Sequence, residues 1–475
     1  MRIPVKIVLA SLFSCAALFA QSPDTMWTKT FGANHDDFGL SVQQTIDRGY
    51  IVVGSTKSFG AGGSDVWLIK ADLNGDTLWT KVFGGDNSDE GRFVQQTSDS
   101  GYIVISTTHS FGAGFGDIWL IKTDANGDTL WTKTFGGVGD ESANLIQQTS
   151  DNGYIIIGNP GNYDVWLIKT DSDGDSLWTK TLGGIGEDWC RSIQQTFDDG
   201  YIIAGSTIGY GTGIIDVWLI KTDANGDPLW TKTFGGSDVD WGSWARQTLD
   251  GGYILTGYTE SFGAGNRDLW LIKTNANGDT LWTRTFGGIG DEWGNSVQQT
   301  SDGGYIITGG TDDHAVWLIR TDANGNCLWT KTLGISEDYG NSVQQTSDGG
   351  YIIAGSTSSY GVGSSFDVWL IKIAPEVTAI DGSPQVVIYD YSLQQNYPNP
   401  FNSMTRIRYS IYSTQFVSLK VYDLLGKHIA TLVNEQKPVG DYTVEFHPIN
   451  LSSGIYFYQL EVGNSRQARK MILLK

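Results

Sequence analysis

The sequence is poor in the residues that staple small proteins or carry out common kinds of catalysis. Its 475 residues include only three cysteines and five histidines. Cys190 and Cys327 are the two thiols beyond the N-terminal segment, and two distant thiols form neither a disulfide framework nor a metal cluster. The fold must therefore rest on its hydrophobic core. The sequence also lacks a His-Glu-x-x-His zinc motif, a Gly-x-Ser-x-Gly elbow and a phosphate loop, so we predict no catalytic site.

Basic residues are also scarce. Lysine and arginine number 31 against 52 acidic residues, which gives a net charge of −21. Nucleic acid binding requires a basic surface, so we expect no nucleic acid partner, and an anionic membrane surface is disfavoured for the same reason. An acidic protein suits cations or basic partners. Beyond residue 20, no apolar run is long enough to span a bilayer.

The first 20 residues have the pattern of a secretory signal peptide. Arg2 and Lys6 precede an apolar run over residues 7–19, and Ala20 is a plausible cleavage point. We therefore expect residues 1–20 to be removed on export. The alternative is a lipoprotein signal in which Cys15 becomes the lipidated residue.

Glycine (62 residues) and tryptophan (18 residues) are abundant, and the tryptophans reveal an internal repeat. Two tryptophans recur seven times each, at steps of 52 or 47 residues, so the chain contains seven units. The first series opens the tripeptide Trp-Thr-Lys or Trp-Thr-Arg at Trp27, Trp79, Trp131, Trp178, Trp230, Trp282 and Trp329. The second lies in Val-Trp-Leu-Ile or a close variant at Trp67, Trp119, Trp166, Trp218, Trp270, Trp317 and Trp369.

Each unit contains four short strand candidates joined by tight turns. In the copy over residues 192–234, Asp-Gly and Asn-Gly turns link the extended runs, which predicts two hairpins in a four-stranded meander. The third strand, around Trp218, is apolar at successive positions, so both of its faces must be covered. The fourth strand carries a Lys or Arg, which would discourage edge-to-edge pairing. Since no unit has a helical period, we exclude an α-solenoid.

These features predict an all-β fold, with a seven-bladed β-propeller over residues 26–373. The chain begins with a lone fourth-type strand over residues 26–32, and its last unit stops after the third strand at residues 367–373. We therefore expect the N-terminal strand to complete the last blade and close the ring. The turn followed by Trp resembles the repeats of quinoprotein-type propellers. Leu-Ile-Lys and Asn-Gly replace that family's usual elements, so the resemblance implies no quinone cofactor.

Composition changes after residue 373. We expect a linker over residues 374–391 and a small immunoglobulin-like β-sandwich over residues 392–475, because alternating apolar runs return there. Its motif residues are Pro398, Asn399, Pro400, Phe401, Asn402, Gly426, Gly454 and Tyr456. With these motifs, the segment resembles the type A C-terminal sorting domain of the type IX secretion system, which implies export by that machinery to the outer cell surface or beyond. A generic spacer sandwich is the alternative.

Acidic pairs recur in the loops that lead into each first strand, and aromatic residues follow several of them. We expect these loops to surround the mouth of the central channel and to bind a cation such as Ca²⁺, a basic protein or a glycan. The alternative is that the acids cap turns and the aromatics fill gaps between blades. The candidate residues are Asp188, Trp189, Asp240, Trp241, Asp291, Glu292, Trp293, Glu337, Asp338 and Tyr339.

The third and sixth units lack five residues between their second and third strands, at residues 159–163 and 311–315. This asymmetry could shape a groove next to His314 or could record a duplicated deletion. The sequence as a whole predicts a secreted or surface-anchored binding or adhesion module. The alternatives are an extracellular polysaccharide hydrolase or lyase, and a structural component of the surface layer.

Overall fold

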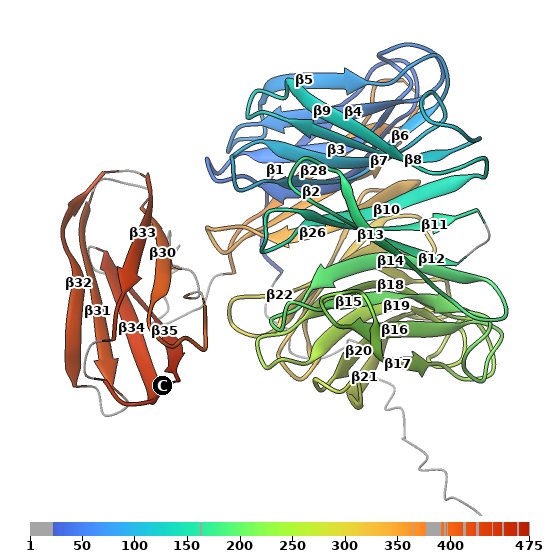
Figure 1. Cartoon of the computed structure of the whole chain (residues 1–475). Coiled ribbons are helices and arrows are strands. Elements are labelled where there is room, and N and C mark those ends of the chain that lie inside the picture. Colours follow the sequence, from blue (N-terminus) through green and yellow to red (C-terminus); the bar gives the residue numbers. More distant parts are fainter. Residues whose placement is uncertain are drawn as a thin grey trace, which may run out of the picture. The chain divides into compact units, whose positions relative to one another are not determined.

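The computed structural model describes residues 22–161, 164–363, 365–376, 391–393, 396, 398–411, 415–423, 427–438, 440–448, 451–462 and 465–474. The expected signal peptide and most of the expected linker lie outside these residues. The chain divides into two compact units, Met1–Glu376 and Val377–Lys475, which are considered separately (Figure 1). The part of the chain that the structure describes has no helix long and apolar enough to cross a membrane.

The first unit consists of seven four-stranded antiparallel sheets, the predicted blades (Figure 1). The innermost strands are β2 (Asp37–Gln44), β6 (Asp89–Gln96), β10 (Glu141–Gln148), β14 (Asp188–Gln195), β18 (Asp240–Gln247), β22 (Trp293–Gln299) and β26 (Asp338–Gln345). The second strands are β3 (Tyr50–Thr56), β7 (Tyr102–Thr108), β11 (Tyr154–Pro160), β15 (Tyr201–Thr207), β19 (Tyr253–Thr259), β23 (Tyr305–Gly310) and β27 (Tyr351–Thr357). The third strands are β4 (Asp65–Ala71), β8 (Asp117–Thr123), β12 (Val165–Thr170), β16 (Asp216–Thr222), β20 (Asp268–Thr274), β24 (Val316–Thr321) and β28 (Asp367–Ile373). The outermost strands are β5 (Thr77–Phe83), β9 (Thr129–Phe135), β13 (Ser176–Leu182), β17 (Pro228–Phe234), β21 (Thr280–Phe286), β25 (Cys327–Leu333) and β1 (Thr25–Phe31).

In the blade that begins with β14, the turn between the first and second strands needs its glycine for space rather than for a positive φ. Positive φ falls on Asp199 (63°), the residue before the glycine. Gly200 is needed for space, because a Cβ there would lie 2.2 Å from the carbonyl oxygen of Thr222 and 2.4 Å from Lys221 Nζ. The turn is glycine-bearing because the next strand approaches it closely.

A buried lysine ties the two hairpins of a blade together. Lys221 Nζ donates to the Asp198 carboxylate at 3.0 Å and to the carbonyl oxygen of Thr222 at 2.7 Å, with only 5% of the lysine side chain exposed. Burial by itself would raise the pKa of Asp198, but hydrogen bonds from Thr196 and Lys221 outweigh it and lower that pKa. The same pairing recurs as Lys70–Asp47, Lys122–Asp99, Lys169–Asp151, Lys273–Asp250, Arg320–Asp302 and Lys372–Asp348.

The outermost tryptophan of each blade packs against the next blade. Trp79 of β5 meets the ring of Tyr102 edge-on at 5.9 Å between centroids. A Cβ on Gly127 would lie 2.7 Å from the Trp79 ring, so glycine in that turn lets the indole sit flat on it. Lys81 forms an ion pair with Asp128 of the same turn at 2.7 Å. The charge on the fourth strand, which we expected to deter edge pairing, thus also links neighbouring blades. The seven rings pair as Trp27–Tyr50, Trp79–Tyr102, Trp131–Tyr154, Trp178–Tyr201, Trp230–Tyr253, Trp282–Tyr305 and Trp329–Tyr351.

The N-terminal strand completes the seventh blade, as predicted. β1 pairs antiparallel with β28, placing Trp27 opposite Lys372 and Phe31 opposite Val368. The innermost strands of the first and seventh blades are also joined, since Gln44 N donates to the side-chain oxygen of Gln344 at 2.6 Å. The chain therefore runs from β1 of the seventh blade directly into the first blade, and hydrogen bonds between β1 and β28 close the ring.

The second unit contains two sheets that share one hydrophobic core, in agreement with the predicted small sandwich. One sheet has the order β29-β30-β33 and the other β32-β31-β34-β35. Their strands are β29 (Tyr391–Leu393), β30 (Thr405–Ile411), β31 (Gln415–Asp423), β32 (His428–Lys437), β33 (Gly440–Phe446), β34 (Gly454–Val462) and β35 (Ser465–Leu473).

We predict that Trp27→Ala destabilises the propeller by about 2 kcal/mol, because it removes the indole that joins β1 to the first blade. Met26 is the matched control, since it precedes Trp27 in β1 and is 56% exposed. Met26→Ala should leave stability within about 0.5 kcal/mol of the parent. Chemical denaturation gives the stabilities, and amide exchange in β28 reports opening of the ring. Equal effects of the two substitutions would contradict the proposed importance of this seam.

Candidate functional site

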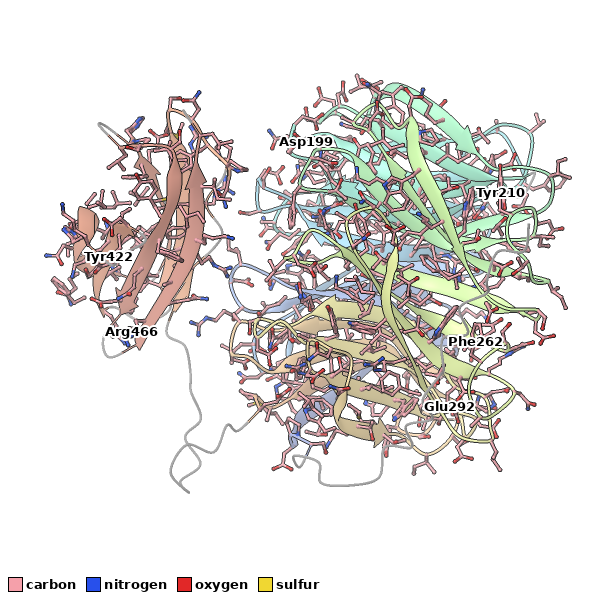
Figure 2. All side chains as sticks on the ribbon, turned by 90° about the horizontal axis from the view of Figure 1, so that it is seen from below. Asp199, Tyr210, Phe262, Glu292, Tyr422 and Arg466 are labelled. Atoms are coloured by element: carbon pink, nitrogen blue, oxygen red, sulfur yellow. The ribbon has the colours of Figure 1, made fainter. Side chains whose placement is uncertain are left out.

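The two ends of the propeller blades carry different loops (Figure 2). Asp199 marks the end formed by the turns after the innermost strands, whereas Tyr210, Phe262 and Glu292 lie at the opposite end. That opposite end is formed by the loops before the innermost strands and by those between second and third strands, which share backbone hydrogen bonds such as Asp89 N to Ser64 O at 2.5 Å. We call it the loop face. All ten candidate residues predicted for ligand binding belong to segments at this face.

Most of the predicted acidic residues are buried and form hydrogen bonds within their own loops. Asp188, Asp240 and Asp338 are fully buried, and Glu292 is only 9% exposed. Each carboxylate accepts a backbone N–H from its own loop at 2.8–2.9 Å, and burial raises the pKa of both Asp240 and Glu292. These groups therefore cap loops, whereas Asp291 is partly buried and Glu337 is exposed. The backbone donors are those of Gly184, Gly236, Gly288 and Ile335.

In several blades, a second buried carboxylate lies next to the acid that caps the loop. Asp65, at the start of β4, is 2% exposed, and burial raises its pKa to about 6, helped by the nearby charge of Asp89. Gly84 lies against both carboxylates. A Cβ at this position would lie 1.7 Å from Asp65 and 2.9 Å from Asp89, so a larger residue would not fit between them. Among the described residues, no group of three or more His, Cys, Asp or Glu side chains could hold a metal ion. These pairs are thus parts of the blade junctions.

The predicted aromatic residues form an extended arc at the loop face. Trp189 and Trp241 lie 5.2 Å apart between ring centroids, and Tyr258 stacks on Trp241 at 6.5 Å. A second run goes from Trp293 through His314 to Tyr339 and continues to Phe366 and Phe38, with spacings of 5.3–6.4 Å. We call these rings the aromatic arc. It comprises Trp189, Trp241, Tyr258, Trp293, His314, Tyr339, Phe366 and Phe38, all partly or fully exposed.

Sequence reasoning missed Tyr258 and Phe366 and did not place His314 in the site. Tyr258 did leave a signal, because the other copies carry Ser, Thr, Asn or Gly at that repeat position. His314 ends the shortened loop of the sixth unit, in a turn closed by its N–H and the carbonyl of Thr311 at 2.8 Å. The shortening therefore brings an imidazole between two aromatic rings. Part of the corresponding loop of the third unit, residues 162–163, lies outside the described residues.

A cavity of about 310 Å³ opens beside the Trp241 end of the arc. Three of its lining residues, Arg191, Ser243 and Asn295, occupy the same position in consecutive innermost strands, where the register slips by one residue. Such a β-bulge re-aims the extra side chain. Trp241, Tyr258 and Trp293 complete the lining. This cavity is thus lined by guanidinium, hydroxyl, amide and aromatic groups.

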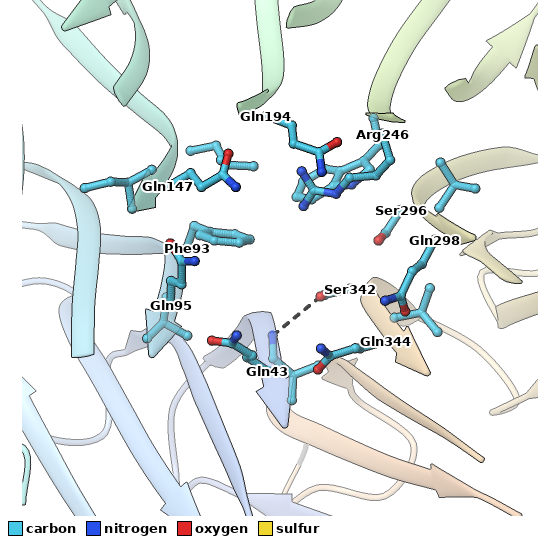
Figure 3. A pocket seen from close by; sticks show the side chains of 17 residues that line it. Gln43, Phe93, Gln95, Gln147, Gln194, Arg246, Ser296, Gln298, Ser342 and Gln344 are labelled. Atoms are coloured by element: carbon cyan, nitrogen blue, oxygen red, sulfur yellow. Dashed lines mark hydrogen bonds between the residues drawn. The ribbon is translucent and has the colours of Figure 1, made fainter. Parts of the chain in front are cut away.

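A second cavity of about 170 Å³ lies in the central channel toward the other end of the blades (Figure 3). Glutamine side chains surround it, and their oxygens accept backbone N–H groups of the next blade, as in Gln96 N to Gln43 at 2.6 Å. Arg246 replaces this glutamine in one blade and stacks on Trp244 at 4.7 Å. Trp244 in turn faces Phe93 across the channel at 6.1 Å. The side-chain oxygens of these glutamines are therefore engaged in joining neighbouring blades.

The sorting-motif residues of the second unit hold its last strand. Asn399 Oδ1 accepts the N–H of Ile472 at 2.7 Å, and Phe401, which is 3% exposed, bonds to Ile472 and Leu474 through its backbone. Tyr456 is also buried and donates to the carbonyl of Ser452 at 2.9 Å. Pro398, Pro400, Asn402 and Gly454 are exposed, whereas Gly426 lies outside the described residues.

Residues 395–474 match the family model described as the secretion system C-terminal sorting domain. This confirms the resemblance found in the motifs. The domain marks the protein for export by the type IX secretion machinery to the extracellular space or the cell surface. A search of curated proteins found no significant match to the chain.

Solved structures give only distant similarities to this chain. A fungal alcohol oxidase of the AA5 family, in complex with copper, has a TM-score of 0.49 at 11% identity and covers 95% of this chain and 100% of its own. Sqt1 from Chaetomium thermophilum has a TM-score of 0.44 at 11% identity, covering 82% and 97%. A protein of unknown function from Dyadobacter fermentans has a TM-score of 0.42 at 10% identity, covering 74% and 100%. Scores this low support no argument about function.

We predict that Asp65→Asn stabilises the protein at pH 7 but not at pH 4. The raised pKa of Asp65 means that the folded state keeps a proton that the unfolded chain releases above about pH 4. Wild-type stability therefore falls as the pH rises from about 4 through 6, and asparagine removes a cost of about 1–2 kcal/mol at neutral pH.

Asp47→Asn is the control of opposite sign for this experiment. Burial opposes ionisation of Asp47, but bonds from Thr45 and Lys70 prevail and lower its pKa. Its ionised form stabilises the fold above about pH 4, and this contribution is lost as the pH falls through the lowered value. Melting temperatures between pH 4 and 8 measure both variants. A pH-independent difference between Asp65→Asn and wild type would contradict the assignment.

Proposed function

We propose that the propeller unit of this exported protein is a glycan-binding module that works at the cell surface or in the extracellular space. The observation that carries the proposal is the aromatic arc on the loop face. Flat aromatic side chains beside hydrogen-bonding groups are well suited to sugar rings, because each ring offers an apolar face and a polar edge. The arc spans several blades and so offers room for more than one sugar.

A glycan fits the loop face better than the other ligands considered from the sequence. A basic protein or a calcium ion would need carboxylates that are free to bind it. Asp188, Asp240 and Asp338 are fully buried and already accept backbone N–H groups. The aromatic side chains, in contrast, keep exposed surface. These buried carboxylates are therefore unavailable to a ligand, whereas the aromatic arc remains available for stacking.

The same burial favours binding over hydrolysis. Glycosidases of the common two-carboxylate kind need an acid and a base on either side of the scissile bond. In this propeller the buried Glu292 and Asp240 are bonded to the backbone of Gly288 and Gly236. We therefore place the polysaccharide hydrolase or lyase second, and a purely structural surface-layer role third.

We predict that the full protein binds members of a glycan array and that Trp241→Ala with Trp293→Ala weakens this binding at least about tenfold. The loss is expected because each indole supplies stacking area worth about 1 kcal/mol or more. Phe115→Ala is the control, since Phe115 is 79% exposed in another loop of the same face. It should leave affinity within about twofold of the parent. Absence of binding to every glycan would contradict the proposal, and release of reducing ends from a bound polysaccharide would favour hydrolysis.

A further inference from the structure

The cavity beside Trp241 carries a charge opposite to that of the protein as a whole. The protein has a net charge of −21. Its innermost strands nevertheless present three guanidinium groups, on Arg92, Arg191 and Arg246. The acidic residues at the start of these same strands are largely buried and bonded to their loops. Of the three, Arg191 lines the cavity beside Trp241 and is the charged residue in that lining.

The three guanidinium groups differ in what already binds them. Arg92 forms an ion pair with Glu90 at 2.8 Å. Arg246 stacks on Trp244 and donates to the carbonyl of Ile193 at 3.5 Å. Arg191 lies over the Trp241 ring at 5.7 Å, and within the described part of the chain it forms no ion pair or hydrogen bond. Arg191 is therefore the cation whose donors remain available.

The surroundings of Arg191 favour an anionic partner. Arg191 is exposed, but partial desolvation by the surrounding protein lowers its pKa, and repulsion from Arg92 adds to this effect. Arginine stays protonated despite such a shift, because its ordinary pKa is far above neutrality. Arg267 is the other cation near Tyr258, at 5.0 Å from that ring, and it is neutralised by Glu260 at 2.9 Å. A bound anion would therefore relieve an uncompensated charge at Arg191.

We propose that this cavity binds a carboxylated sugar, with the sugar carboxylate on Arg191 and an apolar face of the ring against Trp241. This inference rests on the proposed glycan-binding function and specifies its ligand class. A planar guanidinium can hold a carboxylate by two parallel hydrogen bonds, which a neutral hydroxyl cannot match. Ser243, Tyr258 and Asn295 supply polar groups for the sugar hydroxyls.

The size and position of the cavity agree with a single sugar residue at the end of a short chain. Its volume of about 310 Å³ is at the lower end of small-ligand pockets, which run from about 300 to 1,000 Å³. The remaining rings of the arc would contact neighbouring sugars. A neutral sugar in the same place would remove water from the guanidinium without returning a negative charge, which costs affinity.

The test compares matched acidic and neutral ligands on the full protein. Isothermal titration would use trisaccharides of glucuronate, galacturonate and mannuronate, each beside its carboxyl-reduced neutral counterpart. We expect the best acidic trisaccharide to bind at least about tenfold more tightly than its neutral partner. Arg191→Ala should abolish this preference, so that the acidic and neutral trisaccharides bind within about twofold of each other.

Two further variants separate charge from folding. Arg191→Lys keeps the positive charge but loses the planar guanidinium that can hold a carboxylate by two hydrogen bonds. It should therefore retain part of the preference for acidic over neutral trisaccharides. Arg92→Ala is the matched control, because Arg92 occupies the same bulge position two blades earlier and already has a carboxylate partner. It should keep the preference within about twofold of the parent. Equal binding of acidic and neutral trisaccharides by the wild-type protein would overturn this inference and leave glycan binding intact. Failure to bind any glycan, here and on the array, would overturn both.

Discussion

Each blade of this propeller must cover both of its faces, and the rest of the structure depends on that requirement. The second and third strands of most blades are buried along their whole length, as β15 and β16 show. A sheet that is apolar on both sides is stable only between two neighbours, so a row of blades has unsatisfied faces at its ends. Closing the row into a ring removes those ends. Pairing of β1 with β28 provides the closure.

The repeated polar residues serve the same requirement. Buried lysines join the hairpins within a blade, and outer-strand lysines with tryptophans join one blade to the next. Acidic residues such as Asp240 cap the loops at the blade junctions. Repetition in this chain therefore indicates architecture. The ligand-binding function that we propose depends instead on residues that depart from the repeat, among them Tyr258, His314 and Arg191.

The second unit shows how a sorting signal can also be part of a fold. Asn399 and Phe401 belong to the family motif, yet their contacts hold the last strand in place. The aromatic rings and the β-bulge cavity lie in the other unit. The second unit thus specifies export, whereas the ligand binding that we propose belongs to the propeller unit. Changes to the loops of the propeller need not disturb the packing that forms the sorting unit.

Much of the candidate site could be predicted from sequence, because the repeat marks which loops are equivalent. Trp189, Trp241, Trp293 and Tyr339 were identified in this way, and the structure places all four in the aromatic arc. The sequence does not distinguish acids that bind a ligand from acids that cap their own loops. A carboxylate in a loop has the same letter whether it faces solvent or accepts a backbone N–H, and only the folded loop distinguishes the two.

The sequence alone determined the number of blades, the four strands in each, the completion of the last blade by the first strand and the sorting domain. The blade features follow from local patterns of turns and apolar residues that repeat along the chain, whereas the sorting domain follows from the resemblance carried by its motifs. Only the tertiary structure shows which acids are buried and how His314 comes to lie between two aromatic rings. It also shows that a β-bulge directs the side chain of Arg191 toward the cavity. Those features depend on the spatial neighbours of each residue. In a closed ring such neighbours lie some 50 or, across the seam, 300 residues apart, as the bonds of Gln96 to Gln43 and Gln44 to Gln344 illustrate.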